Sequence, residues 1–384
     1  MNNFEYQNPV KIVFGKGQIA KLKELIPSNA NILITCGGGS IKQNGVYEQV
    51  IAALAGFRYH EFWGIEPNPK YETLMKAVEV VRNEDITFLL AVGGGSVLDG
   101  TKFIANASLA PKGEEWNILK GKYIPTNGVA LASVLTLPAT GSEMNAGAVI
   151  TRLESKEKLA FHSPFSYPKF SVLDPETTFS LSQTQRANGV VDAFVHVIEQ
   201  YLTYPVNSPI QDRFAESILR TLIEESQTYC AENKYDTAAN VMWASTVALN
   251  GLIAVGVVTD WATHVIGHEI TMLHGVDHAR TLAIVLPSLL KVQKEQKREK
   301  LIAYAKHVWH ICEGSDDDKI TQAIDKTENF FRNLGIFTKL SEYNIPQTTI
   351  AEIASRLNDR GWRALGERKD ITPAKVQEIL TLAF

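Results

Sequence analysis

A change in the hydrophobic pattern near residue 175 constrains the fold more than any other feature of this 384-residue sequence. Before it, short apolar runs bounded by glycine alternate with amphipathic stretches, a rhythm in which strands and helices follow one another. Strands separated by helices form a parallel sheet that is covered on both faces. After Asp174-Pro175 the apolar residues follow a 3.6-residue period in long stretches. The sequence therefore predicts an α/β half followed by an all-α half.

The predicted elements can be given as residue ranges. The first half contains eight candidate strands, at 10–14, 31–36, 58–62, 87–92, 129–136, 148–152, 159–162 and 170–173. The first long helices of the second half are predicted at 184–203, 209–232, 236–254 and 261–273. The chain also exceeds the roughly 250 to 300 residues that one hydrophobic core supports. We therefore expect two domains, at residues 1–180 and 181–384.

Composition and charge limit the classes of function. Apolar residues make up 45% of the chain and charged residues 21%, which is ordinary for a globular protein. A net charge of -4 argues against a nucleic-acid partner, because such binding relies on clustered Lys and Arg. No apolar run is long enough to span a membrane, and the amino terminus has no signal-peptide pattern. Three cysteines fit a reducing compartment better than a disulfide framework, so we expect a cytoplasmic protein with a small-molecule partner.

Asp192 and His196 are the first candidates for a metal site. They lie at positions i and i+4 of the predicted helix 184–203, so their side chains are neighbours on one face. His264 and His268 repeat this spacing in the next candidate segment. Each of these histidines taken alone is better explained by an ordinary core or surface role. Together with the Asp192 and His196 pair, however, the set indicates a metal site.

His278 can join such a site only if the chain reverses direction. In a continuous helix it would lie about 21 Å along the axis from His264, too far to share one ion. Gly275 is placed where a helix could end, because glycine takes the left-handed conformation without a Cβ penalty. Four of the nine histidines lie between residues 264 and 278. Imidazoles with one carboxylate suit Zn²⁺, Fe²⁺ or another first-row ion better than Ca²⁺ or Mg²⁺.

Two copies of the tetrapeptide GGGS follow apolar strands, at residues 37–40 and 93–96. Successive glycines let backbone N–H groups approach a pyrophosphate, and the helix that follows adds its positive end. Each copy alone could equally be a tight turn, since neither has the GxGxxG pattern. As a pair after parallel strands they favour a dinucleotide. The loop at residues 136–147 is either a further wall of the same site or a plain surface connection.

Four segments in this order make the chain resemble the iron-containing, group III alcohol dehydrogenases. They are GGGSVLDGTK at 93–102, LPATGSE at 137–143, VVDAFVHVIEQY at 190–201 and the H-x3-H-x9-H run that ends at His278. Further segments resemble the bacterial NADPH-dependent aldehyde reductase and butanol dehydrogenase branch: ITCGGGS, GIEPNP and LHGVDHARTLAIVLP. The resemblance implies a dehydroquinate synthase-like plan. In it, an α/β dinucleotide-binding domain with a parallel sheet is followed by an all-α metal-binding domain, with the nicotinamide facing the ion across a cleft.

The resemblance also implies roles for individual residues. The positions that match the metal ligands are Asp192, His196, His264 and His278, and His268 matches a histidine close to the reacting atoms. Those that match the pyrophosphate and nicotinamide loop are Gly94, Gly95, Ser96 and Asp99. Further cofactor contacts are matched by Asn68, Thr136, Asn145 and Lys158. A homodimer is implied as well.

The first GGGS loop bears on the choice of cofactor. NAD-preferring relatives place there an aspartate that would repel a 2′-phosphate, and this chain has Gly38 instead. With Ser40 as a donor and Lys42 nearby as a cation, the loop favours NADP(H).

The resulting prediction is an NADP(H)-dependent reduction of short- to medium-chain aldehydes to primary alcohols. A divalent ion, Fe²⁺ or Zn²⁺, would act as a Lewis acid, with His268 as candidate proton donor. The alternatives are a dehydroquinate synthase-like or glycerol dehydrogenase-like enzyme, and a nucleotide or metal sensor without activity.

Overall fold

The computed structural model describes residues 1–384, which form two compact units. The sheet unit comprises residues 7–182 and 233–246, and the helical unit comprises residues 1–6, 183–232 and 247–384. Both units are assembled from separate stretches of the chain, a feature that local periodicity does not reveal.

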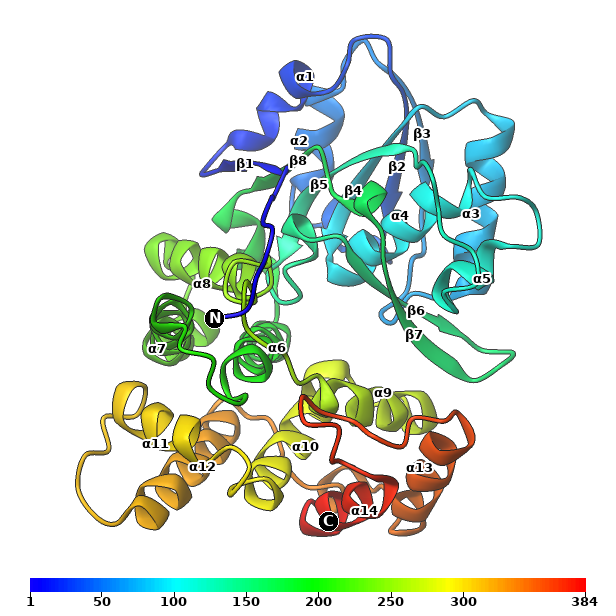
Figure 1. Ribbon diagram of the computed structural model, residues 1–384. Helices are drawn as coiled ribbons and strands as arrows, with labels where there is room; N and C mark the ends of the chain where they lie inside the picture. Colours follow the sequence, from blue (N-terminus) through cyan, green and yellow to red (C-terminus); the bar gives the residue numbers. More distant parts are fainter. The chain divides into compact units, whose positions relative to one another are not determined.

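A six-stranded parallel sheet forms the centre of the sheet unit (Figure 1). The order of its strands is β1-β8-β5-β4-β2-β3. Their bounds are β1 (Lys11–Phe14), β2 (Asn31–Cys36), β3 (Arg58–Phe62), β4 (Phe88–Gly94), β5 (Ala130–Leu137) and β8 (Phe170–Leu173). The two remaining strands, β6 (Gly147–Arg152) and β7 (Glu157–His162), form a separate antiparallel ribbon. The predicted strands are therefore present, and the parallel sheet confirms the expected fold class of this half.

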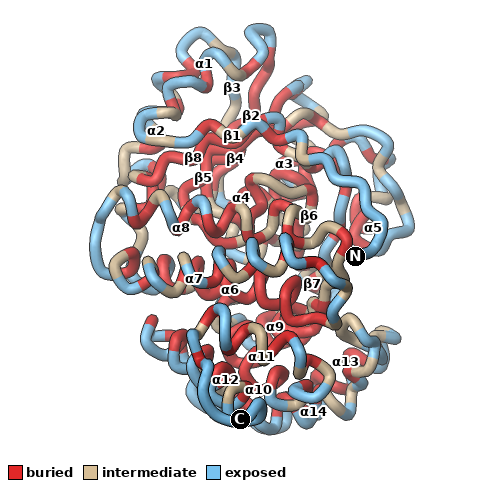
Figure 2. The backbone as a smooth tube through the Cα atoms, turned by 60° about the vertical axis from the view of Figure 1, so that its left-hand side comes forward, coloured by how far each residue is buried: buried red, intermediate tan, exposed pale blue.

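Alternate residues of the central strands face two different hydrophobic cores. In β2, Ile32 and Ile34 pack on one side and Leu33 on the other, as a side-chain period of two requires. Figure 2 shows β4 and β5 in red, because both faces of the sheet are covered. A near-continuous apolar strand is the sequence signature of such a doubly covered sheet.

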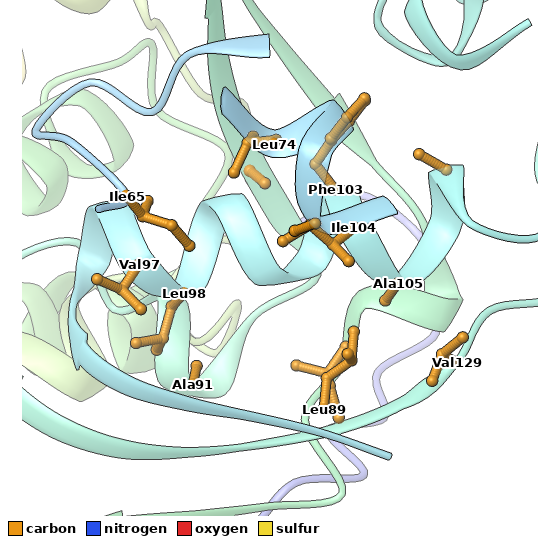
Figure 3. Packing of buried hydrophobic residues seen from close by; sticks show 14 of the residues in the cluster. Ile65, Leu74, Leu89, Ala91, Val97, Leu98, Phe103, Ile104, Ala105 and Val129 are labelled. Carbon is orange, nitrogen blue, oxygen red and sulfur yellow. The ribbon is translucent and has the colours of Figure 1, made fainter. Parts of the chain in front are cut away.

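The helices of the sheet unit divide between the two faces. Residues of α1 (Leu22–Leu25) and α2 (Val46–Ala53) belong to one core, and those of α3 (Tyr71–Asn83), α4 (Gly95–Ala107) and α5 (Glu115–Leu119) to the other. Figure 3 shows the second core, where Leu74 of α3 and Val97, Leu98 and Ile104 of α4 gather over Leu89 of β4. This packing fixes the start of α4 directly after β4.

Helix α8 (Tyr235–Ala248) ends six residues before the predicted end at residue 254. Gly251 has a φ of 91°, which lies outside the range of a right-handed helix. The apolar period continues past the point at which the backbone leaves the helix. The prediction of this helix end was therefore wrong.

The helical unit is built around α10 (His278–Val292). This helix contacts α6 (Gln183–Tyr201), α9 (Ala262–His274), α12 (Asp316–Asn333) and α14 (Pro373–Leu382). The remaining helices are α7 (Pro209–Ala231), α11 (Arg298–His307) and α13 (Thr348–Asp359). The expected all-α second half is thereby confirmed. None of the helices in the chain has both the length and the apolar character needed to cross a bilayer.

Candidate metal centre and cofactor loops

Helix α6 carries Asp192 and His196 on one buried face. Nδ1 of His196 lies 3.8 Å from Oδ1 of Asp192, and both residues are at most 5% exposed. The carboxylate is held in a helix whose neighbouring residues are apolar and buried. A charged group in such a place needs a compensating partner.

The chain reverses at Gly275, as the sequence predicted. Helix α9 ends there, with Gly275 in the left-handed conformation at a φ of 69°, and α10 begins at His278. Helices α9 and α10 pack against each other, so that His264 and His278 come together. Their ring centroids lie 5.2 Å apart.

Three of the predicted metal ligands gather at one point of the helical unit, and the fourth, His278, lies next to one of them. Ligand atoms of Asp192, His196 and His264 lie within 4.8 Å of one another. Nε2 of His278 lies 3.8 Å from Oδ1 of Asp192. That oxygen is fully buried and accepts no hydrogen bond, so a positive ion is the partner it lacks. The donor set of three imidazoles and one carboxylate fits a first-row divalent ion.

His268 lies beside this group on α9. Its ring centroid is 4.9 Å from that of His278 and 6.1 Å from that of His264. The side chain is half-buried, whereas His264 is buried. His268 is therefore close to the centre while retaining access to solvent, as a residue that exchanges protons requires.

Two further residues lie near the centre, and of these Glu199 was not found from the sequence. Glu199, on α6, interacts through Oε2 with Nδ1 of His264, and its Oε1 accepts a hydrogen bond from the Thr263 N–H at 2.6 Å. Trp261 has a φ of 69° at the start of α9 and sets its ring edge-on to His264, with centroids 5.3 Å apart. A glutamate three positions after His196 in an apolar helix was the available signal for Glu199.

Burial raises the pKa of Glu199 to about 8 in the metal-free protein, and the nearby Asp260 carboxylate acts in the same direction. The backbone N–H of Thr263 acts in the opposite direction, because it stabilises the charged form.

His274, for which the sequence indicated no role, lies at the end of α9. Its Nε2 is 2.9 Å from the Thr349 hydroxyl of α13, and burial lowers its pKa. His274 thus connects α9 to α13.

In the sheet unit, three of the expected cofactor segments follow neighbouring strands. The first GGGS loop follows β2, and the second spans the end of β4 and the start of α4. Thr136 lies near the end of β5, and β4 pairs with both β2 and β5. The carboxyl ends of neighbouring parallel strands are where open α/β sheets bind ligands. Gly38 and Ser40 are exposed there, whereas Thr136 is buried.

Gly94, Gly95 and Ser96 lie where β4 passes into α4. A Cβ atom on Gly95 would lie 2.5 Å from the Thr140 side chain, so this position has room only for glycine. No side chain at the N-cap accepts a hydrogen bond from the first turn of α4. The amide groups of that turn are thus available to an anion such as a pyrophosphate.

Asp99 and Asn145 are tied into the loop at residues 140–149. Asp99 accepts hydrogen bonds from the Ser142 hydroxyl at 2.7 Å and the Val149 N–H at 3.0 Å. Asn145 accepts from the Lys102 ammonium at 3.0 Å and donates to the Gly141 carbonyl at 2.8 Å. These contacts hold the loop against α4.

The last two expected cofactor residues contact each other. The Lys158 ammonium donates to Oδ1 of Asn68 at 2.8 Å, and Lys158 is buried. Asn68 has a φ of 55°, a conformation that asparagine tolerates better than most residues.

Buried charged side chains lie around the segment at residues 140–149. Burial lowers the pKa of Lys102 to about 8, although the Asp99 and Glu143 carboxylates act in the opposite direction. Burial also raises the pKa of Asp99 and of Glu143, and Glu143 accepts a hydrogen bond from the Thr246 hydroxyl at 2.6 Å.

Comparison with known proteins gives matches over nearly the whole chain. The family model described as iron-containing alcohol dehydrogenase matches residues 9–175, and that of the C-terminal part of the same family matches residues 186–384. The chain is 56% identical to the NADPH-dependent aldehyde reductase YqhD of Escherichia coli, over 97% of each chain. It is 40% identical to a probable NADH-dependent butanol dehydrogenase of Bacillus subtilis, over 99% of each.

Solved structures agree with these matches. A crystal structure of E. coli YqhD superposes with a TM-score of 0.98 at 54% identity, covering 100% of this chain and 99% of that one. The NADH-dependent butanol dehydrogenase A of Thermotoga maritima superposes with a TM-score of 0.95 at 35% identity, with coverage of 100% and 99%.

Proposed function

The chain belongs to the iron-containing alcohol dehydrogenase family, and we propose that it is an NADPH-dependent reductase of short- to medium-chain aldehydes. The cluster of Asp192, His196 and His264, with His278 beside Asp192, carries the proposal. A centre of this composition, in a chain 56% identical to an aldehyde reductase, supports reduction of a carbonyl at a divalent ion.

These four residues hold the ion in this proposal. When bound, the ion supplies a Lewis acid for the aldehyde carbonyl, and NADPH supplies the hydride. Asp192 provides the one negative charge among the ligands, and the three imidazoles bind in their neutral form. His268 is the candidate for delivering a proton to the alcohol product, because its ring lies next to that of His278 and is open to solvent.

The chain's own loops are proposed to hold the cofactor. The first turn of α4, with Gly94, Gly95 and Ser96, binds the pyrophosphate through backbone amides. Asp99, Thr136, Asn145, Asn68 and Lys158 complete the set of contacts. Gly38 and Ser40 face the 2′-phosphate of NADPH, with Lys42, two residues beyond Ser40, as a cation.

A second candidate is an alcohol dehydrogenase that prefers NADH. It is favoured by the butanol dehydrogenase relatives, which are named as NADH-dependent at up to 40% identity. Steady-state kinetics decide between the two candidate functions. Aldehydes of increasing length are tested with NADPH and with NADH, on iron-loaded and on zinc-loaded protein. We expect kcat/KM with NADPH to exceed that with NADH by at least tenfold. The reverse preference would support the second candidate, and no oxidation of either cofactor would contradict both.

A homodimer and a cytoplasmic location stay predictions of the sequence. Sedimentation equilibrium of the purified chain tests the first of these directly.

A further inference from the structure

Glu199 is a buried carboxylate next to the metal centre without being one of its expected ligands. It lies on α6, one turn beyond His196, and is 3% exposed. Both of its oxygens are engaged by α9: Oε1 accepts from the Thr263 N–H, and Oε2 contacts Nδ1 of His264. A buried carboxylate with two such partners fixes the element that supplies them.

The contact with Glu199 decides which nitrogen of His264 is available to an ion. In its ionised form Glu199 is an acceptor only, so the hydrogen bond then requires a proton on Nδ1 of His264. In a neutral imidazole the other nitrogen, Nε2, then carries the lone pair. Nε2 is the atom that a divalent ion needs from this ring.

Further buried contacts hold the start of α9 in place. The Asp260 N–H donates to the Glu199 carbonyl at 2.8 Å, and Oδ1 of Asp260 accepts from the Ala262 N–H at 2.9 Å. Oδ2 of Asp260 accepts from the Lys297 ammonium at 2.6 Å, which also contacts Glu367 at 3.0 Å. The first turn of α9, and with it His264, is therefore fixed relative to α6 through both the backbone and the side chain of Glu199.

We infer that Glu199 is a positioning residue that holds His264 in the tautomer and orientation required for metal binding. The inference rests on the proposed assignment of His264 as a ligand. Glu199 acts through the imidazole and does not itself contact the ion.

Glu199→Gln is the most direct test because it preserves size. The carboxylate accepts from two donors, the Thr263 N–H and the His264 Nδ1–H. A glutamine amide has one oxygen and one NH₂ group, so in either orientation one donor faces another donor. If the amide NH₂ faces His264, the ring proton moves to Nε2 and blocks metal binding. We expect the affinity for metal to fall about 10- to 100-fold.

The measurement is a titration of chelator-treated protein with Zn²⁺ in competition with a chromophoric chelator, followed by Co²⁺ absorption spectra. Glu269→Gln is the matched control. Glu269 is a buried glutamate on α9 that pairs with Arg356 of α13 and with Arg360. We expect this variant to lose stability but to keep its zinc affinity within about threefold. An equal loss of affinity in both variants would overturn the inference, because it would show a general effect of α9 stability.

His264→Ala separates this inference from the assignment of the ligands. If His264→Ala binds zinc as wild type does, the proposed ligand set fails. If His264→Ala loses affinity while Glu199→Gln does not, the inference about Glu199 alone is overturned. We expect Glu199→Gln to have no additional effect on zinc affinity in the His264→Ala background, because Glu199 acts through that ring.

A second measurement uses the wild-type chain and does not depend on the folding of any Glu199 variant. In zinc-loaded protein with ¹⁵N-labelled histidine, the His264 ring should show a proton on Nδ1 and metal-bound Nε2. A proton on Nε2 would overturn the inference.

Discussion

Oδ1 of Asp192 lies 3.8 Å from Nε2 of His278, although the two residues belong to different helices. This separation is too long for a hydrogen bond. It is shorter than about 4.2 Å, the largest separation of two ligand atoms that share an ion with bonds of about 2.1 Å. The two side chains are therefore spaced as ligands of one ion, without contacting each other directly.

Asp192→Asn should remove most of the bound metal. The variant keeps the shape of the side chain but removes the only negative charge among the four donors, so we expect less than about a tenth of the wild-type metal per chain. Atomic absorption spectroscopy of the dialysed protein measures the metal content per chain. His274→Ala is the control, since His274 contacts Thr349 and should leave the metal content unchanged. Full metal content in Asp192→Asn would contradict the proposed ligand set.

His268→Ala should slow turnover while the ion is retained. If His268 delivers the proton, we expect kcat to fall about 100-fold, within the usual range for loss of a general acid. Wild type and variant are compared between pH 5 and 8. Metal analysis of the same sample is the control. Wild-type turnover across this pH range would exclude the proposed role.

Gly38→Asp should lower the preference for NADPH. A Cβ at Gly38 meets no atom within 4 Å, so the new side chain fits without rearranging the loop. Its charge would repel a 2′-phosphate and accept hydrogen bonds from a free ribose hydroxyl. We expect KM for NADPH to rise at least about tenfold, equivalent to about 1.4 kcal/mol. Gly38→Asn is the uncharged control, and an equal rise in both variants would assign the effect to size rather than charge.

Lys102 should make the folded state more stable as the pH rises from 8 to 10. Below pH 8 Lys102 is protonated in the folded and unfolded chains, and burial penalises the folded cation. Above pH 8 the folded chain releases this proton, whereas the unfolded chain holds it up to the ordinary lysine pKa of 10.5. The unfolded state then binds more protons, so stability rises with pH, by about 1 kcal/mol per unit from this group.

Comparison of wild type with Lys102→Met isolates this contribution, because other groups titrate in both proteins. The free energy of unfolding of metal-free protein, measured in urea at pH 7, 8, 9 and 10, should increase in wild type relative to the variant. A constant or decreasing difference would show that Lys102 stays charged in the folded chain.

Most of the secondary structure could be predicted, because the hydrophobic period of a segment depends only on the residues of that segment. The apolar run Asn31–Cys36 is a strand within the predicted bounds, and Gly275 ends α9 where the sequence required a turn. The end of α8 was missed, since its apolar period continues past residue 248 while Gly251 takes a positive φ. The pairing of β1 with β8 was not predicted, because it joins strands that are distant in sequence.

The sequence by itself determined the chemistry of the metal centre: which donors are present, and that Asp192 and His196 share a helical face. Helical spacing is set by the backbone, so it can be deduced from residue numbers alone. Only the tertiary structure decided which donors meet and how they are oriented. The packing of α10 on α6 brings His278 to Asp192, and Glu199 fixes the ring of His264. Contacts between separate helices depend on how their side chains pack together, which the period of one helix does not contain.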